Sequence, residues 1–139
     1  MKEDILNLLP NWPQHAYAHE LLIRPSHVFL RCCNEVQNET SLTRFCAIRL
    51  RNDEDWPDLA GQLRKLFEFP SSVDHSFQAL FEWLSDLSWL SEGHYALLLD
   101  LSKLDPASQN IFVALDMILK GLAEQSLQRR VRTSLVLFI

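Results

Sequence analysis

The apolar residues alternate along the chain between strand-like and helix-like spacings. From about Leu21 the chain reads as extended, because the segments LLIR and HVFLRCC are rich in β-branched and aromatic residues. The polar segment NEVQNETS separates them from RFCAIRLR, in which Phe45, Ile48 and Leu50 indicate another strand. We therefore expect two strands joined by a polar turn, as in a β-hairpin, in this part of the chain.

Three amphipathic helices are predicted further along. The first begins at Asp55, a favourable N-cap, and ends at Pro70. The second begins near Ser76, and the third runs from Asp105 to about Gln128. Their apolar residues recur three or four positions apart, as one buried face requires. These residues are Leu59, Leu63, Leu66 and Phe67, then Phe77, Leu80, Leu84 and Leu87, then Ile111, Leu115, Ile118 and Leu122.

Two further strands complete the pattern. Tyr95 to Leu99 is a short continuous apolar run, typical of a strand buried on both faces, and SLVLFI closes the sequence. The order from residue 45 is therefore strand, helix, helix, strand, helix, strand. This order predicts an α/β fold with a small parallel sheet of about three strands covered by helices. The 139 residues fit one domain, with an N-terminal extension over 1–44 and a core over 45–139.

The composition predicts a cytoplasmic protein. Residues 1–22 carry acidic residues and two prolines where a signal peptide has a basic segment and an apolar stretch. No segment approaches the roughly 18 consecutive apolar residues of a membrane helix. An odd number of cysteines suits neither a disulfide framework nor a zinc site, so we interpret them as buried or half-buried thiols. They are Cys32, Cys33 and Cys46.

The distribution of charge points to a basic protein as the partner. The formal net charge is -5. Between Asp53 and Asp100, ten acidic residues oppose only Arg64 and Lys65, which leaves a local excess of eight negative charges. A surface of this sign repels the phosphates of nucleic acid, so direct nucleic-acid binding is not expected. A basic protein fits the same surface through complementary charge.

One segment carries a resemblance to a known family. Residues 69–87 read FPSSVDHSFQALFEWLSDL. The chain here resembles barstar-like ribonuclease inhibitors, which have a leucine-proline pair, two aromatics and a glycine before a second helix of pattern asparagine-leucine-aspartate-alanine-leucine-tryptophan-aspartate. Phe69-Pro70 aligns with the leucine-proline pair, and residues 76–82 align with the helix pattern without gaps. The resemblance covers about residues 45–139, and it departs from the family at Ser72, Val73, Asp74, Gln78 and Glu82.

The resemblance implies a protein inhibitor whose second helix and preceding loop enter the active-site cleft of a ribonuclease. Glu82 would take the place of the main acidic anchor, and Phe81 that of its aromatic neighbour. Gln78 would replace a lost carboxylate, and Ser72 a contacting aromatic. Asp74 and Asp86 complete the predicted partner-binding set. From the residues alone, Asp74 also fits a helix cap, and Glu82 and Asp86 also fit a solvated helix face.

We expect no enzymatic activity, cofactor or metal. Asp74, His75 and Ser76 include the residue types of a catalytic triad, but sequential neighbours cannot form its geometry. Three glycines leave no phosphate-cradling loop, and the histidines lack a metal-binding spacing. The expected partner is a basic ribonuclease or nuclease toxin, bound by a monomer. The alternative is a non-catalytic interaction module on the same scaffold, and an exposed apolar patch on the second helix would favour it.

The extension has two open interpretations. In a barstar-like sheet we expect the first family strand to lie between neighbours, so an added strand would join at an edge. A dimer surface is the other interpretation.

Overall fold

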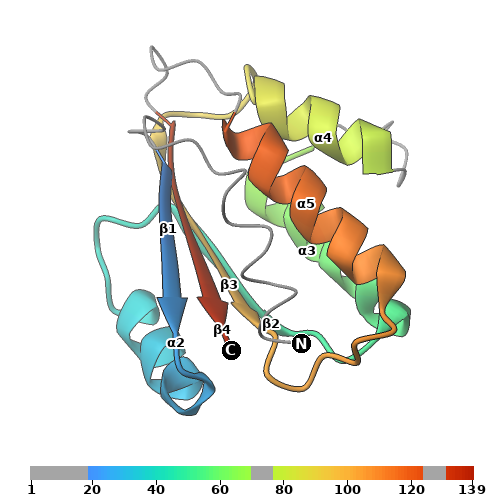
Figure 1. The fold of residues 1–139 in the computed structure, drawn as a ribbon. Helices are drawn as coiled ribbons and strands as arrows, with labels where there is room; N and C mark the ends of the chain where they lie inside the picture. Colours follow the sequence, from blue (N-terminus) through green and yellow to red (C-terminus); the bar gives the residue numbers. More distant parts are fainter. Residues whose placement is uncertain (1–18, 70–76, 124–130) are drawn as a thin grey trace.

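The centre of the molecule is a sheet of four parallel strands. The computed structural model describes residues 19–69, 77–123 and 131–139. The strands are β1 (His19–Arg24), β2 (Arg44–Arg49), β3 (Gly93–Asp100) and β4 (Val131–Phe138), in the spatial order β1-β4-β3-β2 (Figure 1). Every pairing is parallel, which confirms the predicted α/β class.

Helices cover both faces of this sheet. On one face lie α3 (Trp56–Phe67), α4 (Phe77–Asp86) and α5 (Gln109–Ala123), and α2 (Phe29–Gln37) lies on the other (Figure 1). Connections between parallel strands are almost always right-handed. The chain crosses the sheet one way from β1 to β2 and the opposite way from β2 through β3 to β4. Its connecting helices must therefore lie on opposite faces.

The predicted β-hairpin is wrong. β1 pairs with β4 and β2 pairs with β3, so the two strands lie at opposite edges of the sheet. The residues between them form a short 3-10 turn (Ser26–Val28) and α2, because parallel strands need a crossover connection. The first family strand, β2, is an edge strand rather than a central one. The extension supplies the other edge, β1.

Helical spacing explains why HVFLRCC is a helix and not a strand. Val28 and Phe29 are buried, whereas Leu30 is 63% exposed. Cys32, Cys33 and Val36 come one and two turns later and pack against the same cluster. The period of burial is thus that of a helix, although the composition is that of a strand. The ring of Phe29 meets Phe138 edge-on at 5.0 Å between centroids, which ties α2 to the end of β4.

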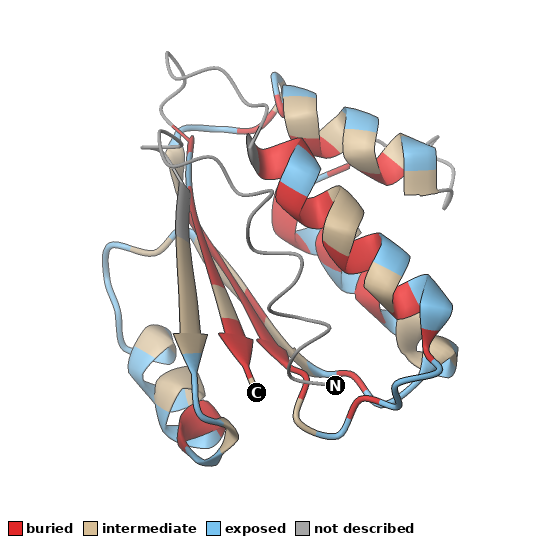
Figure 2. Cartoon of the chain, viewed as in Figure 1, coloured by how far each residue is buried: buried red, intermediate tan, exposed pale blue. Residues whose placement is uncertain are grey.

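The core has two parts, one on each face of the sheet. The larger part packs β3 and β4 against α3, α4 and α5 through residues such as Leu97, Leu99 and Leu135. The smaller part packs Ala96 and Leu98 against α2. All residues of β3 from Tyr95 onward are buried, as the apolar run predicts (Figure 2). The predicted apolar residues of α3 and α5 are likewise buried.

The helix ends differ from the predicted ones in detail. Asp55 is the N-cap residue of α3, as predicted, but its side chain makes no cap hydrogen bond to that helix. It belongs instead to the capping box of the preceding 3-10 turn (Asp53–Asp55), where the Asn52 side chain accepts the N–H of Glu54 at 2.8 Å. α5 begins at Gln109, four residues after the predicted start. α3 ends at Phe67, before Pro70. Position 70, the predicted start of the second helix at 76 and the predicted end of the third at 128 lie outside the described residues.

The cysteines are thiols, as interpreted from the sequence. No disulfide joins them; Cys46 on β2 is buried, and Cys32 and Cys33 on α2 are half-buried. Burial raises the pKa of the Cys46 thiol from 9.0 to about 11. Burial is also the main cause of the raised pKa of Cys33, and neighbouring Cys32 adds to it.

Cys46 should make stability fall at alkaline pH. Because its pKa is raised in the folded state, its contribution is fully present below pH 9 and is lost as pH rises toward about 11. We expect the difference in unfolding free energy between the wild type and Cys46→Ala to be constant up to pH 8.5 and then to shift against the wild type. Urea unfolding of both proteins from pH 7 to pH 10.5 measures this difference. A difference independent of pH would contradict the assignment.

Candidate functional site

α4 carries the predicted partner-binding residues that the structure describes. Gln78, Glu82 and Asp86 are exposed on this helix, and Phe81 is half-buried. The two other predicted residues, at positions 72 and 74, lie outside the described residues. The structure therefore brings four of the six predicted residues together on one element.

α4 is held by its apolar stripe and by an unusually close approach to α5. Leu80 and Leu84 of the helix, and Leu87 directly after it, are buried in the larger core. At the contact, a Cβ atom on Gly121 of α5 would lie 2.8 Å from the Leu84 Cβ and 3.1 Å from the Phe81 carbonyl oxygen. Only a residue without a side chain fits this distance. The glycine therefore sets how deeply α4 sits on α5.

Aromatic residues fix the chain that follows α4. Trp83 and Trp89 meet edge-on with ring centroids 4.9 Å apart. The indole N–H of Trp89 donates to the Phe67 carbonyl oxygen at 2.9 Å, and its ring also meets Phe69. These contacts join the end of α3 to the chain that follows α4. They therefore hold the helix that carries Glu82 in place. Sequence reasoning missed this cluster, because tryptophans six residues apart follow neither a helical nor a strand period.

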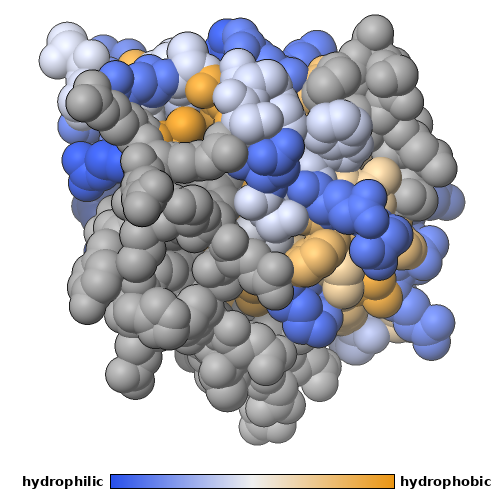
Figure 3. All heavy atoms as spheres, turned by 90° about the horizontal axis from the view of Figure 1, so that it is seen from above, coloured by the Kyte–Doolittle hydropathy of each residue, from blue (hydrophilic) through white to orange (hydrophobic). Residues whose placement is uncertain are grey.

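The outward face of α4 is polar. Gln78, Glu82 and Asp86 follow each other at intervals of four residues, so they form one stripe along the helix. The Gln78 side-chain amide donates to a Glu82 carboxylate oxygen at 3.3 Å, and the Ser88 hydroxyl donates to Asp86 at 3.1 Å. In Figure 3, which views the molecule from above, hydrophilic residues cover much of the described surface, with hydrophobic ones between them.

The acidic excess counted from the sequence does not form one surface. Several of its carboxylates are used within the fold. Asp53 accepts the N–H of Ile111 at 3.1 Å and so caps α5, and Asp55 accepts the N–H of Arg51 at 2.6 Å. Two others are held by arginines, Glu68 by Arg44 and Asp100 by Arg49.

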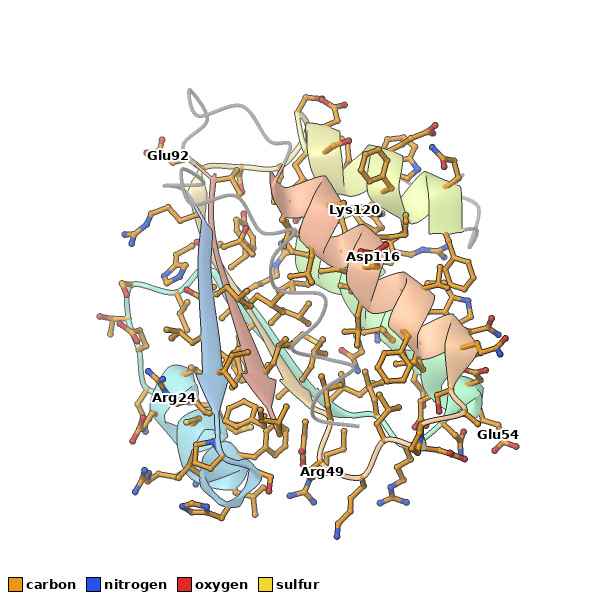
Figure 4. All side chains as sticks on the ribbon, viewed as in Figure 1. Arg24, Arg49, Glu54, Glu92, Asp116 and Lys120 are labelled. Atoms are coloured by element: carbon orange, nitrogen blue, oxygen red, sulfur yellow. The ribbon has the colours of Figure 1, made fainter. Side chains whose placement is uncertain are left out.

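Among the described residues, the exposed acids that remain lie in separate places. Glu82 and Asp86 are on α4, Glu92 lies in the loop before β3, and Glu54 and Asp58 lie near the start of α3. Figure 4 shows Glu54 and Glu92 at opposite ends of the molecule. The acidic character of α4 is therefore local, and it depends on Glu82 and Asp86.

The described residues hold neither a cluster of metal-ligating side chains nor a membrane-spanning helix. Within residues 19–69, 77–123 and 131–139, no three histidine, cysteine or acidic side chains are grouped so that they could hold a metal ion. In the same part of the chain, no helix has the length and apolar character needed to span a membrane.

Comparison with known proteins finds one family. The family model of barstar, described as barnase inhibitor, matches residues 43–138, which is well over half of the chain. This range agrees closely with the resemblance over about residues 45–139, and β1 and α2 precede the match. Neither a curated protein nor a solved structure matches the chain.

The contact at Gly121 can be tested by a pair of glycine substitutions. Gly121→Ala should cost about 1–3 kcal/mol of unfolding free energy, because the added methyl group overpacks the α4–α5 contact. Gly61→Ala is the matched control: it lies within α3, and apart from its chain neighbours and the backbone of its own helix no atom lies within 4 Å of the Cβ position. This variant should gain about 0.5–1 kcal/mol. Chemical denaturation measures both. A Gly121→Ala protein as stable as the wild type would contradict the described packing.

Proposed function

Because the chain belongs to the barstar (barnase inhibitor) family, we propose that it is a cytoplasmic inhibitor of a basic ribonuclease or nuclease toxin. It binds its target one-to-one, with α4 and the loop before it in the active-site cleft. Family membership supports an inhibitory role. The choice of target, the residues that bind it and the cytoplasmic location are parts of the proposal.

The chain performs no catalysis of its own in this account. Proteins of the barstar family are non-catalytic inhibitors, in agreement with the expectation from the sequence that the chain is not an enzyme. Inhibition then depends on binding energy alone, so the chemistry to be explained is how α4 recognises a cationic cleft.

The observation that carries the proposal is the position of Glu82 on an anchored helix. A ribonuclease cleft presents arginine, lysine and histidine side chains arranged around a phosphate. A carboxylate can pair with such side chains through charge-assisted hydrogen bonds. Glu82 projects from the exposed face of α4, while Leu80 and Leu84 on the opposite face are buried. Little conformational entropy of the backbone is then lost on binding, which favours affinity.

Gln78 changes the charge that the helix offers to a partner. Where the family pattern has a carboxylate, this chain has an amide that donates to Glu82. The contact supports one orientation of the Glu82 side chain, and it lowers the negative charge of the helix by one. A target matched to this helix would therefore have a less cationic cleft than a barnase-like enzyme, as a different nuclease toxin could have.

The alternative, an interaction module without a ribonuclease target, predicts an apolar patch on α4. Among the described residues, the large hydrophobic side chains that are exposed are Leu30 on α2 and Val113 on α5. Both lie outside α4, whose exposed positions are polar or acidic. This distribution favours a charged partner over an apolar one.

Charge reversal at Glu82 tests the binding face. Glu82→Lys should weaken binding to the target ribonuclease at least about 30-fold, because a buried charge pair is replaced by repulsion. Glu54→Lys is the matched control, since it makes the same change of charge on an exposed acid in the turn before α3, away from α4 (Figure 4). It should change affinity less than about threefold.

Affinity is measured by surface plasmon resonance against barnase and any basic nuclease encoded beside the gene. The association rate of the wild type should fall as salt is added, because steering between opposite charges is screened. Equal affinities of the Glu82→Lys and Glu54→Lys proteins for a ribonuclease that binds the wild type would exclude α4 as the binding face.

A further inference from the structure

A cavity lies at the carboxyl end of the parallel sheet, away from α4. It has a volume of about 290 Å³ and is lined by residues that follow three different strands: Ser26 after β1, Arg49 and Arg51 at the end of β2, and Asp100, Ser102 and Lys103 at the end of β3. Figure 4 shows Arg49 at the end of the molecule opposite to α4. The proposed inhibitor surface and this cavity therefore do not overlap.

The topology of the sheet makes this position a natural binding site. The chain leaving β1 turns to the face covered by α2, whereas the chain leaving β3 turns to the face covered by α5. In open α/β sheets, ligands bind where successive connections diverge to opposite faces, at the carboxyl ends of the strands. Ser26 and Ser102 lie on the two diverging connections, and the cavity lies between them.

A buried carboxylate orients one arginine of the cavity. Asp100 is 5% exposed and lies opposite Arg49 in the last register position of β2 and β3. One of its oxygens accepts Arg49 Nε–H at 3.1 Å, and the other accepts the backbone N–H and the hydroxyl of Ser102 at 3.1 and 2.8 Å. The Arg49 guanidinium carbon also lies over the ring of Phe29, 5.1 Å from the ring centroid. The hydrogen bond from Arg49 to Asp100 therefore comes from Nε.

The other two cations, Arg51 and Lys103, follow the ends of β2 and β3. Arg51 is fixed on both sides, because its N–H donates to Asp55 and its carbonyl accepts the N–H of Asp105 at 2.7 Å. Within the described part of the chain, the side chains of Arg51 and Lys103 are exposed and form no ion pair. Three cations and one carboxylate give the lining an excess of two positive charges, in a chain whose net charge is -5.

We propose that this cavity binds a phosphate group. A phosphate monoester carries about -1.5 to -2 charges at pH 7, which matches the excess of the lining. Guanidinium groups bind phosphate oxygens through two parallel hydrogen bonds, and an arginine held by a carboxylate is already oriented to do so. The volume is close to the lower limit for small-molecule sites, so the ligand is inorganic phosphate or a small phosphate ester.

Titration of the isotope-labelled full chain tests the site without any ribonuclease. Sodium phosphate is added at constant ionic strength, and backbone amide shifts are followed by NMR. We expect saturable shifts at Ser26, Ser102 and Lys103 with a dissociation constant of about 1 mM or lower. The double variant Arg51→Gln/Lys103→Gln should bind phosphate at least tenfold more weakly. The control Lys65→Gln, an exposed cation on α3 near the start of β2, should change the constant less than twofold.

Two further arms separate the sources of the signal. A nucleoside monophosphate that binds at least tenfold more tightly than inorganic phosphate would support an organic ester as the ligand, and equal affinities would support recognition of the phosphate group alone. Sodium chloride that produced the same shifts as phosphate would overturn the proposal, because it would show general screening. Equal phosphate affinities of the double variant and Lys65→Gln would overturn it as well. Failure of this test leaves the α4 proposal unaffected.

Discussion

Burial of β3 and β4 between two layers of helices is the constraint on which the rest of the structure depends. Both strands pair on each side, and most of their residues are buried. Parallel strands of this kind need apolar cover on both faces. One face is covered by α3, α4 and α5, and the other by α2 from the N-terminal segment. The residues that precede the family match therefore contribute directly to the core.

Because of the same constraint, some charged residues stabilise the fold and others remain available on the surface. Carboxylates at the ends of helices and strands are used inside the fold: Asp53 caps α5, and Asp100 orients Arg49 at the carboxyl end of the sheet. Glu82 and Asp86 lie on the outer side of α4, beyond the two-layer core. The molecule thus has an acidic helix at one end and a basic cavity at the other. Each could serve a partner of opposite charge.

Much of the fold could be predicted from periodicity, because a buried stripe repeats at the period of its element. The stripes of α3 and α5 and the continuous apolar run of β3 are examples. The strand prediction for the segment around Phe29 was wrong. A run of β-branched and aromatic residues hides a helical period when only one side of the helix is buried. The predicted hairpin was wrong as well, because strand pairing depends on contacts between residues far apart in the sequence.

The site could be predicted in part. Gln78, Phe81, Glu82 and Asp86 fall on one helix, as helical spacing requires. The acidic surface was overestimated, because a count of charges cannot tell which carboxylates cap a helix or pair with an arginine. Gly121 had a readable signal, since an isolated glycine within an apolar helix often marks close packing. The cavity beside Arg49 had none, because its residues come from three connections that only the folded sheet brings together.

The most direct test of the account is a titration of ribonuclease activity with the purified chain. Barnase, and any basic nuclease encoded beside the gene, is held at a fixed concentration while the chain is added and RNA cleavage is followed. We expect the activity of the target enzyme to fall linearly and to reach zero at one equivalent. Full activity of every enzyme in the presence of a large excess of the chain would contradict it.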